Sequence, residues 1–272
     1  MGLFGFLDFT KEGPGISKNA PKKRALFVFF DIYFRNFWKF FSINLFYNLI
    51  SLPLITQGFA KAGITNIARN LARDKHSFGL SDFITTIKKN WKQALGVGLL
   101  NTIISAILLF GIWFYDESYR QTKMNLSLAG LIMCLLLYAL FNMMNYYLYT
   151  LMITFDFKFK ALYVNSLKFV LLNFWRTLLC GIILFLTTGI YVFIGLMFPD
   201  ARVWLIEAII MIATLPSFRY LVIQFFTFGS IKKYIIDPYY KAHPNTDIEQ
   251  RRNLGLEIPE DDEDYEPPIS WE

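Results

Sequence analysis

The sequence has few charged, cysteine and histidine residues for its length. Of 272 residues, 18% are charged, two are cysteines and two are histidines. A soluble domain carries about a quarter charged residues. Cys134 and Cys180 lie inside apolar runs, so the chain has neither a disulfide framework nor the CxxC spacing of a metal site. The histidines, His76 and His243, fall in expected loops.

The sequence also lacks the motifs of the common enzyme classes. It contains no HExxH, no GxSxG, no phosphate-binding glycine loop and no pair of carboxylates deep within an apolar run. We therefore expect no enzymatic activity, no catalytic or metal-binding residues and no cofactor. Because it has no ATP-binding segment, the chain is not expected to energise transport by itself.

Long hydrophobic runs dominate what is present. Hydrophobic residues make up 55% of the chain and aromatic residues 18%. Apolar runs of about 18 or more residues predict transmembrane helices. The net charge is +6, but the basic residues fall between the runs, which is typical of membrane orientation rather than nucleic-acid binding. The sequence therefore predicts an all-α, polytopic membrane protein that binds no nucleic acid.

One short sequence recurs ahead of three of these runs. It reads Asn-Phe-Trp-Lys at 36–39, Asn-Trp-Lys at 90–92 and Asn-Phe-Trp-Arg at 173–176. Each copy ends an amphipathic segment, which predicts a helix on the membrane surface followed by a helix that enters the bilayer. Indole rings favour the headgroup level and long cations reach toward it. The predicted interface anchors are therefore Trp38, Lys39, Trp91, Lys92, Trp175 and Arg176. Specific binding of anionic lipid headgroups is the functional alternative.

The three copies predict three repeats, each a surface helix plus a membrane hairpin, at about 26–73, 80–155 and 162–230. Six helices should enter the membrane, five of them with clear hydropathy. Together they form a membrane domain at 25–233, between a flexible cytosolic lead at 1–24 and an acidic, disordered cytosolic tail at 234–272. We expect a multi-pass protein of a bacterial cell membrane with both termini in the cytoplasm.

The one membrane-entering helix without clear hydropathy is the second limb of the first hairpin, residues 54–73. Basic residues stand on both sides of the first hairpin, at 22–24 and from Arg69 to Lys92. A single crossing would leave one basic flank outside, against the positive-inside rule. The limb should therefore return toward the cytoplasm, either as a full, protein-buried helix or as a re-entrant one.

Polar residues recur every four positions along this limb and form a stripe: Gln57, Lys61, Thr65, Arg69 and Arg73. The stripe could line a cavity open to the cytoplasm and suited to an anionic or sugar-like ligand. Alternatively, the helix could simply emerge into solvated headgroups, and for Arg69 and Arg73 this second interpretation is favoured.

Ionisable residues within the last apolar run are further candidates for the cavity. Glu207 lies near the outer end of the run, where it could reach water. Arg219 follows Pro216 by three residues and could bond to a carbonyl that the proline leaves free. Asn142 and Asn145 in the middle hairpin could bridge helices.

Three segments resemble a known family: Leu-Pro-Leu-Ile-Thr-Gln-Gly at 52–58, Asp-Phe at 82–83 and Lys-Asn-Trp-Lys-Gln-Ala at 89–94. Their order and spacing resemble the YesL-like bacterial integral membrane proteins of unknown function, over roughly Arg24 to Lys233. The family's genes often neighbour those of carbohydrate ABC importers in Gram-positive bacteria. The resemblance thus implies an accessory role near sugar uptake and brings no catalytic residues.

These observations support two functional hypotheses. The leading one is a non-enzymatic accessory protein that contacts ABC transporter permease subunits within a bilayer of anionic headgroups. The alternative is a permease for a small sugar or anion, with a polar cavity lined by the 54–73 helix. The substrate, the partner and homo-oligomerisation stay open.

Overall fold

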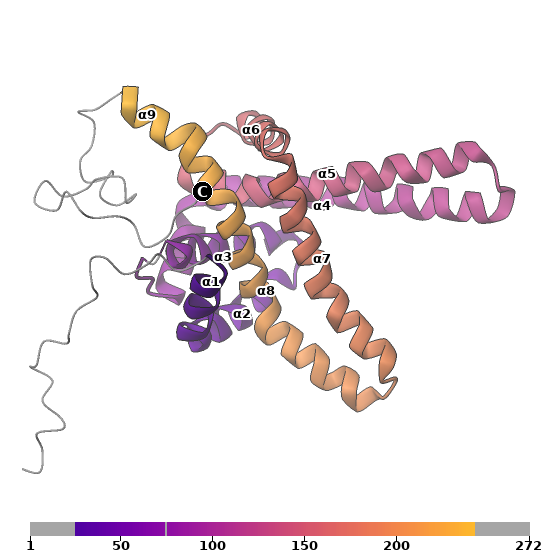
Figure 1. Cartoon of the computed structure of the whole chain (residues 1–272), viewed down its shortest axis with the longest axis horizontal. Coiled ribbons are helices and arrows are strands. Elements are labelled where there is room, and N and C mark those ends of the chain that lie inside the picture. The colour runs from indigo at the N-terminus through magenta and orange to yellow at the C-terminus, as the bar shows by residue number, and fades with distance from the viewer. Residues whose placement is uncertain (1–24, 74, 243–272) are drawn as a thin grey trace, which may run out of the picture.

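The computed structural model describes residues 25–73 and 75–242, which are helical apart from short connections and contain no strand (Figure 1). The helices in chain order are α1 (Ala25–Arg35), α2 (Phe37–Ser51), the 3-10 turn η2 (Leu54–Thr56), α3 (Gln57–Ala72), α4 (Leu80–Thr122), α5 (Asn125–Thr154), α6 (Phe159–Leu172), α7 (Phe174–Met197), α8 (Ala201–Ile231), the π-helical η3 (Lys232–Ile236) and α9 (Asp237–Ala242). The predicted cytosolic lead and the tail from residue 243 onward lie outside the described residues.

Four of the described helices are long and apolar enough to cross a membrane, namely α4, α5, α7 and the helix that begins with α8. Large apolar side chains are exposed along them: Phe110 is 63% exposed, Leu136 63% and Phe185 76%. Such extended apolar surface is stable against lipid rather than water. The prediction of a helical, membrane-embedded protein is therefore confirmed.

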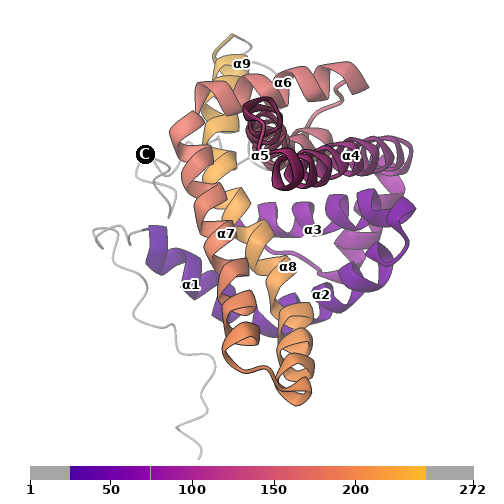
Figure 2. The same ribbon diagram turned by 90° about the vertical axis from the view of Figure 1, so that its right-hand side faces the viewer.

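The long helices form two hairpins, α4–α5 and α7–α8, which diverge from a common base (Figure 1). At this base α3 packs against α4, α5 and α8, and α2 packs against α3 and α8 (Figure 2). The buried core lies here as well. One cluster gathers around Phe40, Ile64 and Leu221, and a second around Tyr147 and Leu151. The short helices thus join the two hairpins.

The recurring asparagines share one local geometry. The side-chain amides of Asn36, Asn90 and Asn173 each donate to the backbone carbonyl four residues earlier, at 2.9, 3.0 and 3.3 Å. At Asn36 and Asn173 the helix is interrupted, so that α1 passes into α2 and α6 into α7. The break at Asn173 precedes α7, which is long and apolar enough to cross a membrane, whereas the break at Asn36 precedes α2, which is not among the helices that meet this criterion.

The second copy does not break the chain, and the separate surface helix expected ahead of Trp91 is wrong. Residues 80–122 form one continuous helix, α4. The reason is packing, because α3 lies along α4 on both sides of Asn90. It contacts Phe83 through Gly63 before the asparagine and Ala94 after it. These contacts hold both parts of α4 in line.

The predicted start of the disordered tail at residue 234 is also wrong. The chain stays helical through η3 and α9 as far as Ala242. Ile236 is buried against the second core cluster, and this apolar contact extends the ordered structure beyond the membrane helix.

Two glycines set the crossing of α3 and α4. A Cβ on Gly58 would overlap the carbonyl oxygen of Ala94, and a Cβ on Gly98 would lie 2.7 Å from the Cα of Gly58. The two backbones therefore approach more closely than any side chain allows, as in membrane helix pairs that contact through small residues. This crossing determines how deeply α3 sits in the bundle.

Substitution of Gly98 by alanine should separate α3 from α4. We expect Gly98→Ala to reduce the free energy of unfolding by about 2 kcal/mol or more, since the backbones must move apart. Gly189 on α7 has nothing within 4 Å of an added Cβ, so Gly189→Ala should be neutral or slightly stabilising. Equilibrium unfolding of both variants in mild detergent measures the difference. Equal stability of the two variants would contradict the close crossing.

Candidate functional site

The site begins with a proline in the middle of α8. Pro216 has no backbone N–H, so the carbonyl of Ile212 loses its helical partner, and the ring disturbs the next bond of the ladder. Asn48 of α2 donates to the Ile212 carbonyl at 2.9 Å. Asn44, one turn earlier, donates to the carbonyl of Ala213 at 2.6 Å and accepts from the backbone N–H of Ser217 at 2.8 Å. Two asparagines of α2 therefore replace the hydrogen bonds that α8 lacks.

This arrangement corrects the role expected for Arg219. The freed carbonyl is satisfied by Asn48, and the Arg219 guanidinium instead donates to the hydroxyl of Thr188 on α7 at 3.0 Å. Arg219 lies one helical turn beyond Pro216 and borders a polar cavity at the base of the hairpins. Neither asparagine was singled out from the sequence. The signal available was an i, i+4 pair of amides within an otherwise apolar run.

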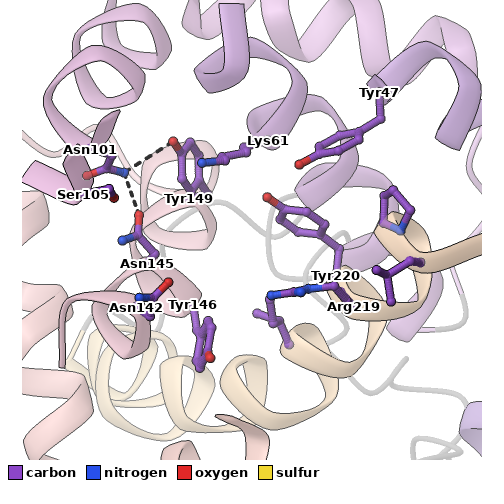
Figure 3. A pocket seen from close by; sticks show the side chains of 13 residues that line it. Tyr47, Lys61, Asn101, Ser105, Asn142, Asn145, Tyr146, Tyr149, Arg219 and Tyr220 are labelled. Carbon is purple, nitrogen blue, oxygen red and sulfur yellow. Dashed lines mark hydrogen bonds between the residues drawn. The ribbon is translucent and has the colours of Figure 1, made fainter. Parts of the chain in front are cut away.

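The central cavity has a volume of about 320 Å³ and lies where α2, α3, α4, α5 and α8 meet (Figure 3). Its lining residues are Tyr47, Lys61, Asn101, Ser105, Asn142, Asn145, Tyr146, Tyr149, Leu215, Pro216, Arg219, Tyr220 and Ile223. Two of them are cations, and no aspartate or glutamate of the described residues lines the space. The cavity is therefore polar and positively charged.

One wall of the cavity is a hydrogen-bonded network between the middle helices. The amide of Asn101 on α4 donates to Asn145 of α5 at 2.6 Å and to the hydroxyl of Tyr149 at 3.4 Å. Tyr163 of α6 donates to the Asn101 carbonyl oxygen at 2.9 Å. The predicted helix-bridging role therefore holds for Asn145, whereas the amide of Asn142 bonds to Tyr138 of its own helix.

The opposite wall carries the charges. The side chains of Lys61, Arg219, Tyr47 and Tyr220 point from α2, α3 and α8 into the shared space (Figure 3). The Lys61 ammonium lies 5.9 Å from the ring centroid of Tyr149, within the range of a cation–π contact. The sequence does not single out Asn101 or the tyrosines, because single amides or phenols in apolar runs resemble ordinary packing residues.

The predicted stripe on α3 divides between different surroundings. Lys61 alone lines the central cavity. Gln57 begins the helix, and the Thr65 hydroxyl is buried and donates to the Lys61 carbonyl at 2.6 Å. Arg69 donates to Thr154 of α5 at 2.7 Å, and Arg73 lies 4.8 Å from the ring centroid of Phe228 on α8. The stripe thus lies mostly between packed helices, and of its residues only Lys61 reaches the cavity. The interpretation favoured for Arg69 and Arg73, that they emerge into solvated headgroups, does not agree with these contacts with Thr154 and Phe228.

The carboxyl end of α3 gathers several cations. Arg69 and Arg73 are partly buried there, and Lys75 follows in the loop to α4. Burial, then the charges of Arg73 and Arg69, lower the pKa of Lys75 from 10.5 to about 8. This end of the site therefore carries the same sign of charge as the central cavity.

The remaining candidates lie elsewhere. Glu207 does not line the cavity and sits beside Gly195 near the turn between α7 and α8. Trp38, Trp91 and Trp175 are 77%, 49% and 79% exposed, as interface anchors would be.

The anchor cations are more engaged with the protein than expected. Lys39 donates to the Ser77 carbonyl at 2.8 Å, Arg176 donates to the Phe225 carbonyl at 3.3 Å, and Lys92 lies 5.6 Å from the Trp91 ring centroid. Two of the three therefore tie the helix starts to neighbouring segments. Within the described ranges no group of three or more His, Cys, Asp or Glu could hold a metal ion.

Fold and site together define a helical membrane protein with a central polar cavity. Among known proteins, the chain is similar to a family described as a protein of unknown function, DUF624, whose model matches residues 40–112. The match runs from α2 into α4, and it contains the three segments that resemble the YesL-like proteins. No curated protein and no solved structure matches the chain.

The asparagine bridge to the proline break can be tested by a double-mutant cycle. Asn44→Ala should reduce the free energy of unfolding by about 2 kcal/mol, because it leaves buried backbone groups unpaired. In a Pro216→Ala background α8 can form its own backbone hydrogen bonds. Asn44→Ala should then lower the free energy of unfolding by at least about 1 kcal/mol less than it does when Pro216 is present.

Equilibrium unfolding in detergent gives the coupling energy. Asn142→Ala, which removes an amide bonded within its own helix, is the control and should show no coupling to Pro216. Full additivity of Asn44→Ala and Pro216→Ala would show that the two residues do not depend on each other.

Proposed function

We propose that this protein is a non-enzymatic membrane permease that binds a small sugar or anion in its central cavity. One observation carries the proposal: a polar, positively charged space of about 320 Å³ inside a helix bundle with lipid-facing outer surfaces. Polar and ionisable groups at membrane depth are costly, and they persist where they line a pathway or a binding site. Pockets of about 300 Å³ and above are large enough for small ligands.

The position of the cavity supports this proposal. If the membrane begins at Ala94 on α4, Asn101 lies about 10 Å inside it, given a rise of about 1.5 Å per residue. If α8 leaves the membrane at Phe228, Arg219 lies about 14 Å inside. Asn101 then lies about a third of the way into a core about 30 Å thick, and Arg219 lies near its middle, where transporters hold their substrates. The proline break in α8 beside the cavity is a second feature of such sites.

We extend the proposal to six membrane-entering helices in three repeats. The shared bond of Asn36, Asn90 and Asn173 supports the repeats, and a short helix precedes the hairpin in the first and the third of them. With 15 and 16 residues, α2 and α3 are about 22 and 24 Å long, shorter than the membrane core. Their length favours a re-entrant first hairpin, with both termini in the cytoplasm of a bacterial cell.

A second candidate is an accessory role in carbohydrate uptake by an ABC transporter. The outer parts of the hairpins favour it, since the hairpins diverge (Figure 1). Large apolar side chains such as Phe185 and Leu196 are exposed on them. Such faces could pack against a permease subunit as well as against lipid. Gentle detergent extraction followed by pull-down should then recover a transport component, and its absence would exclude this candidate.

Transport is tested with purified protein in liposomes and a panel of labelled sugars, sugar acids and sugar phosphates. At least one solute should enter faster than into empty liposomes, and Lys61→Ala should reduce this flux at least about tenfold, because it removes a cation from the cavity. Lys89→Ala, on the exposed side of α4, is the matched control and should transport normally. Absence of flux across the panel would reject the permease.

The topology is tested by cysteine labelling in a protein whose native Cys134 and Cys180 have been replaced. Cysteines at Gly5 and at the exposed Phe78 should react from the same side of the membrane, since the first hairpin returns. A cysteine at the exposed Glu117, in the last turns of α4 before the connection to α5, should react from the other side. Labelling of Gly5→Cys and Phe78→Cys from opposite sides would disprove six membrane-entering helices.

A further inference from the structure

The central cavity holds two positive charges without a carboxylate to balance them. Lys61 comes from α3 and Arg219 from α8. The acidic groups of the described residues lie elsewhere: Asp82, for example, accepts from the hydroxyl of Ser77 at 2.9 Å, and Glu207 sits near the outer turn. Removing an ion from water is costly unless a partner of opposite charge compensates for it.

Neutral partners satisfy these cations only in part. In the part of the chain that the structure describes, Lys61 makes no hydrogen bond or ion pair through its ammonium, and its contact there is with the ring of Tyr149. The guanidinium of Arg219 makes one side-chain hydrogen bond, to Thr188. An ammonium has three donors and a guanidinium five, so most of their donors are available to a ligand.

The shape and polarity of the rest of the cavity restrict what the ligand can be. A volume of about 320 Å³ corresponds to about ten water molecules at roughly 30 Å³ each. This holds a small organic molecule or a headgroup but no acyl chains. The phenols of Tyr47 and Tyr220 and the amide of Asn142 lie around the cations and suit hydroxyl groups (Figure 3).

We propose that the central cavity selects a small hydroxylated anion, whose carboxylate or phosphate lies between Lys61 and Arg219 while its hydroxyl groups meet the tyrosines and Asn142. This inference rests on the proposed binding function and names the class of its ligand. The planar guanidinium of Arg219 matches a carboxylate or phosphate with two parallel hydrogen bonds, and Lys61 adds a compact point charge. A neutral sugar of the same size would leave both charges uncompensated.

The same chemistry has two sources, a soluble solute and the headgroup of an anionic lipid. The cavity lies at the base from which the two hairpins diverge (Figure 1), and its cations suit the oxyanion of either source. In both cases the group held is an oxyanion attached to a hydroxylated carbon skeleton. Glycerol 3-phosphate and phosphatidylglycerol represent the two sources.

The first experiment measures binding to the full chain in detergent by isothermal titration calorimetry with matched pairs. These are glycerol 3-phosphate against glycerol, glucose 6-phosphate against glucose, and gluconate against glucose. At least one anion should bind at least about tenfold more tightly than its neutral partner. Lys61→Gln and Arg219→Gln should each weaken that binding about tenfold or more, and Arg219→Lys should retain part of it. Lys89→Gln and Arg202→Gln, both exposed, should leave it unchanged.

The second experiment tests the lipid source. In nanodiscs of phosphatidylglycerol, native mass spectrometry should detect a retained lipid that Lys61→Gln removes, if the headgroup is the ligand. In nanodiscs of phosphatidylcholine the soluble anion should bind as in detergent, if a solute is the ligand. Either result supports an anion between the two cations.

Three outcomes would overturn the inference, and they differ in what they leave standing. Equal binding of glucose and its anionic partners, weakened by Lys61→Gln, would reject anion selectivity and retain the permease. Absence of binding by every soluble probe and by phosphatidylglycerol would reject the anion and the binding function together. Anion binding that survives both Lys61→Gln and Arg219→Gln would assign it to another site.

Stability of the ligand-free protein gives a further measurement that does not depend on the probe. Lys61→Met keeps the length of the side chain and removes the uncompensated charge, so it should raise the unfolding temperature while abolishing stabilisation by the anion. A lower unfolding temperature would show that Lys61 supports the fold and would overturn the assignment.

Discussion

The fold depends on one constraint, that a backbone polar group within a membrane must find its partner inside the protein. Pro216 creates that demand in the middle of α8, and Asn44 and Asn48 of α2 meet it. The bonds connect the first hairpin to the last across more than 160 positions of the chain. They hold α2 beside α8, and through the short connection η2 they also limit where α3 can lie.

The position of α3 then creates the site. On one side its Gly58 meets Gly98 of α4 in direct backbone contact, so the helix is drawn deep into the bundle. Lys61 follows one turn later and reaches the space that Arg219 borders from α8. The proline break in α8 and the glycine crossing of α3 and α4 therefore both help to bring Lys61 and Arg219 to the same cavity. A site built from rigid contacts of this kind can hold like charges close together at the expense of stability.

The distribution of charge gives the site its chemical character. Lys61 and Arg219 line the cavity without an aspartate or glutamate of the described residues beside them, and Arg69, Arg73 and Lys75 gather at the carboxyl end of α3. These cations give this part of the protein a positive potential, which raises the local concentration of anions. The similarity over residues 40–112 covers α3 and parts of α2 and α4, which contribute Tyr47, Lys61, Asn101 and Ser105 to the cavity.

The sequence by itself determined the helical membrane class, because long apolar runs and the basic residues between them are local properties of the chain. It also indicated Lys61, through the polar stripe along residues 54–73, and Arg219, because an ionisable group in an apolar run stands out wherever it lies. It could not show that α4 continues past Asn90, that Asn48 rather than Arg219 satisfies the carbonyl freed by Pro216, or that Arg73 packs against Phe228. These features arise from contacts between segments far apart in sequence. Only the tertiary structure decided them, since hydropathy and spacing describe one helix at a time, whereas residues of five helices line the cavity.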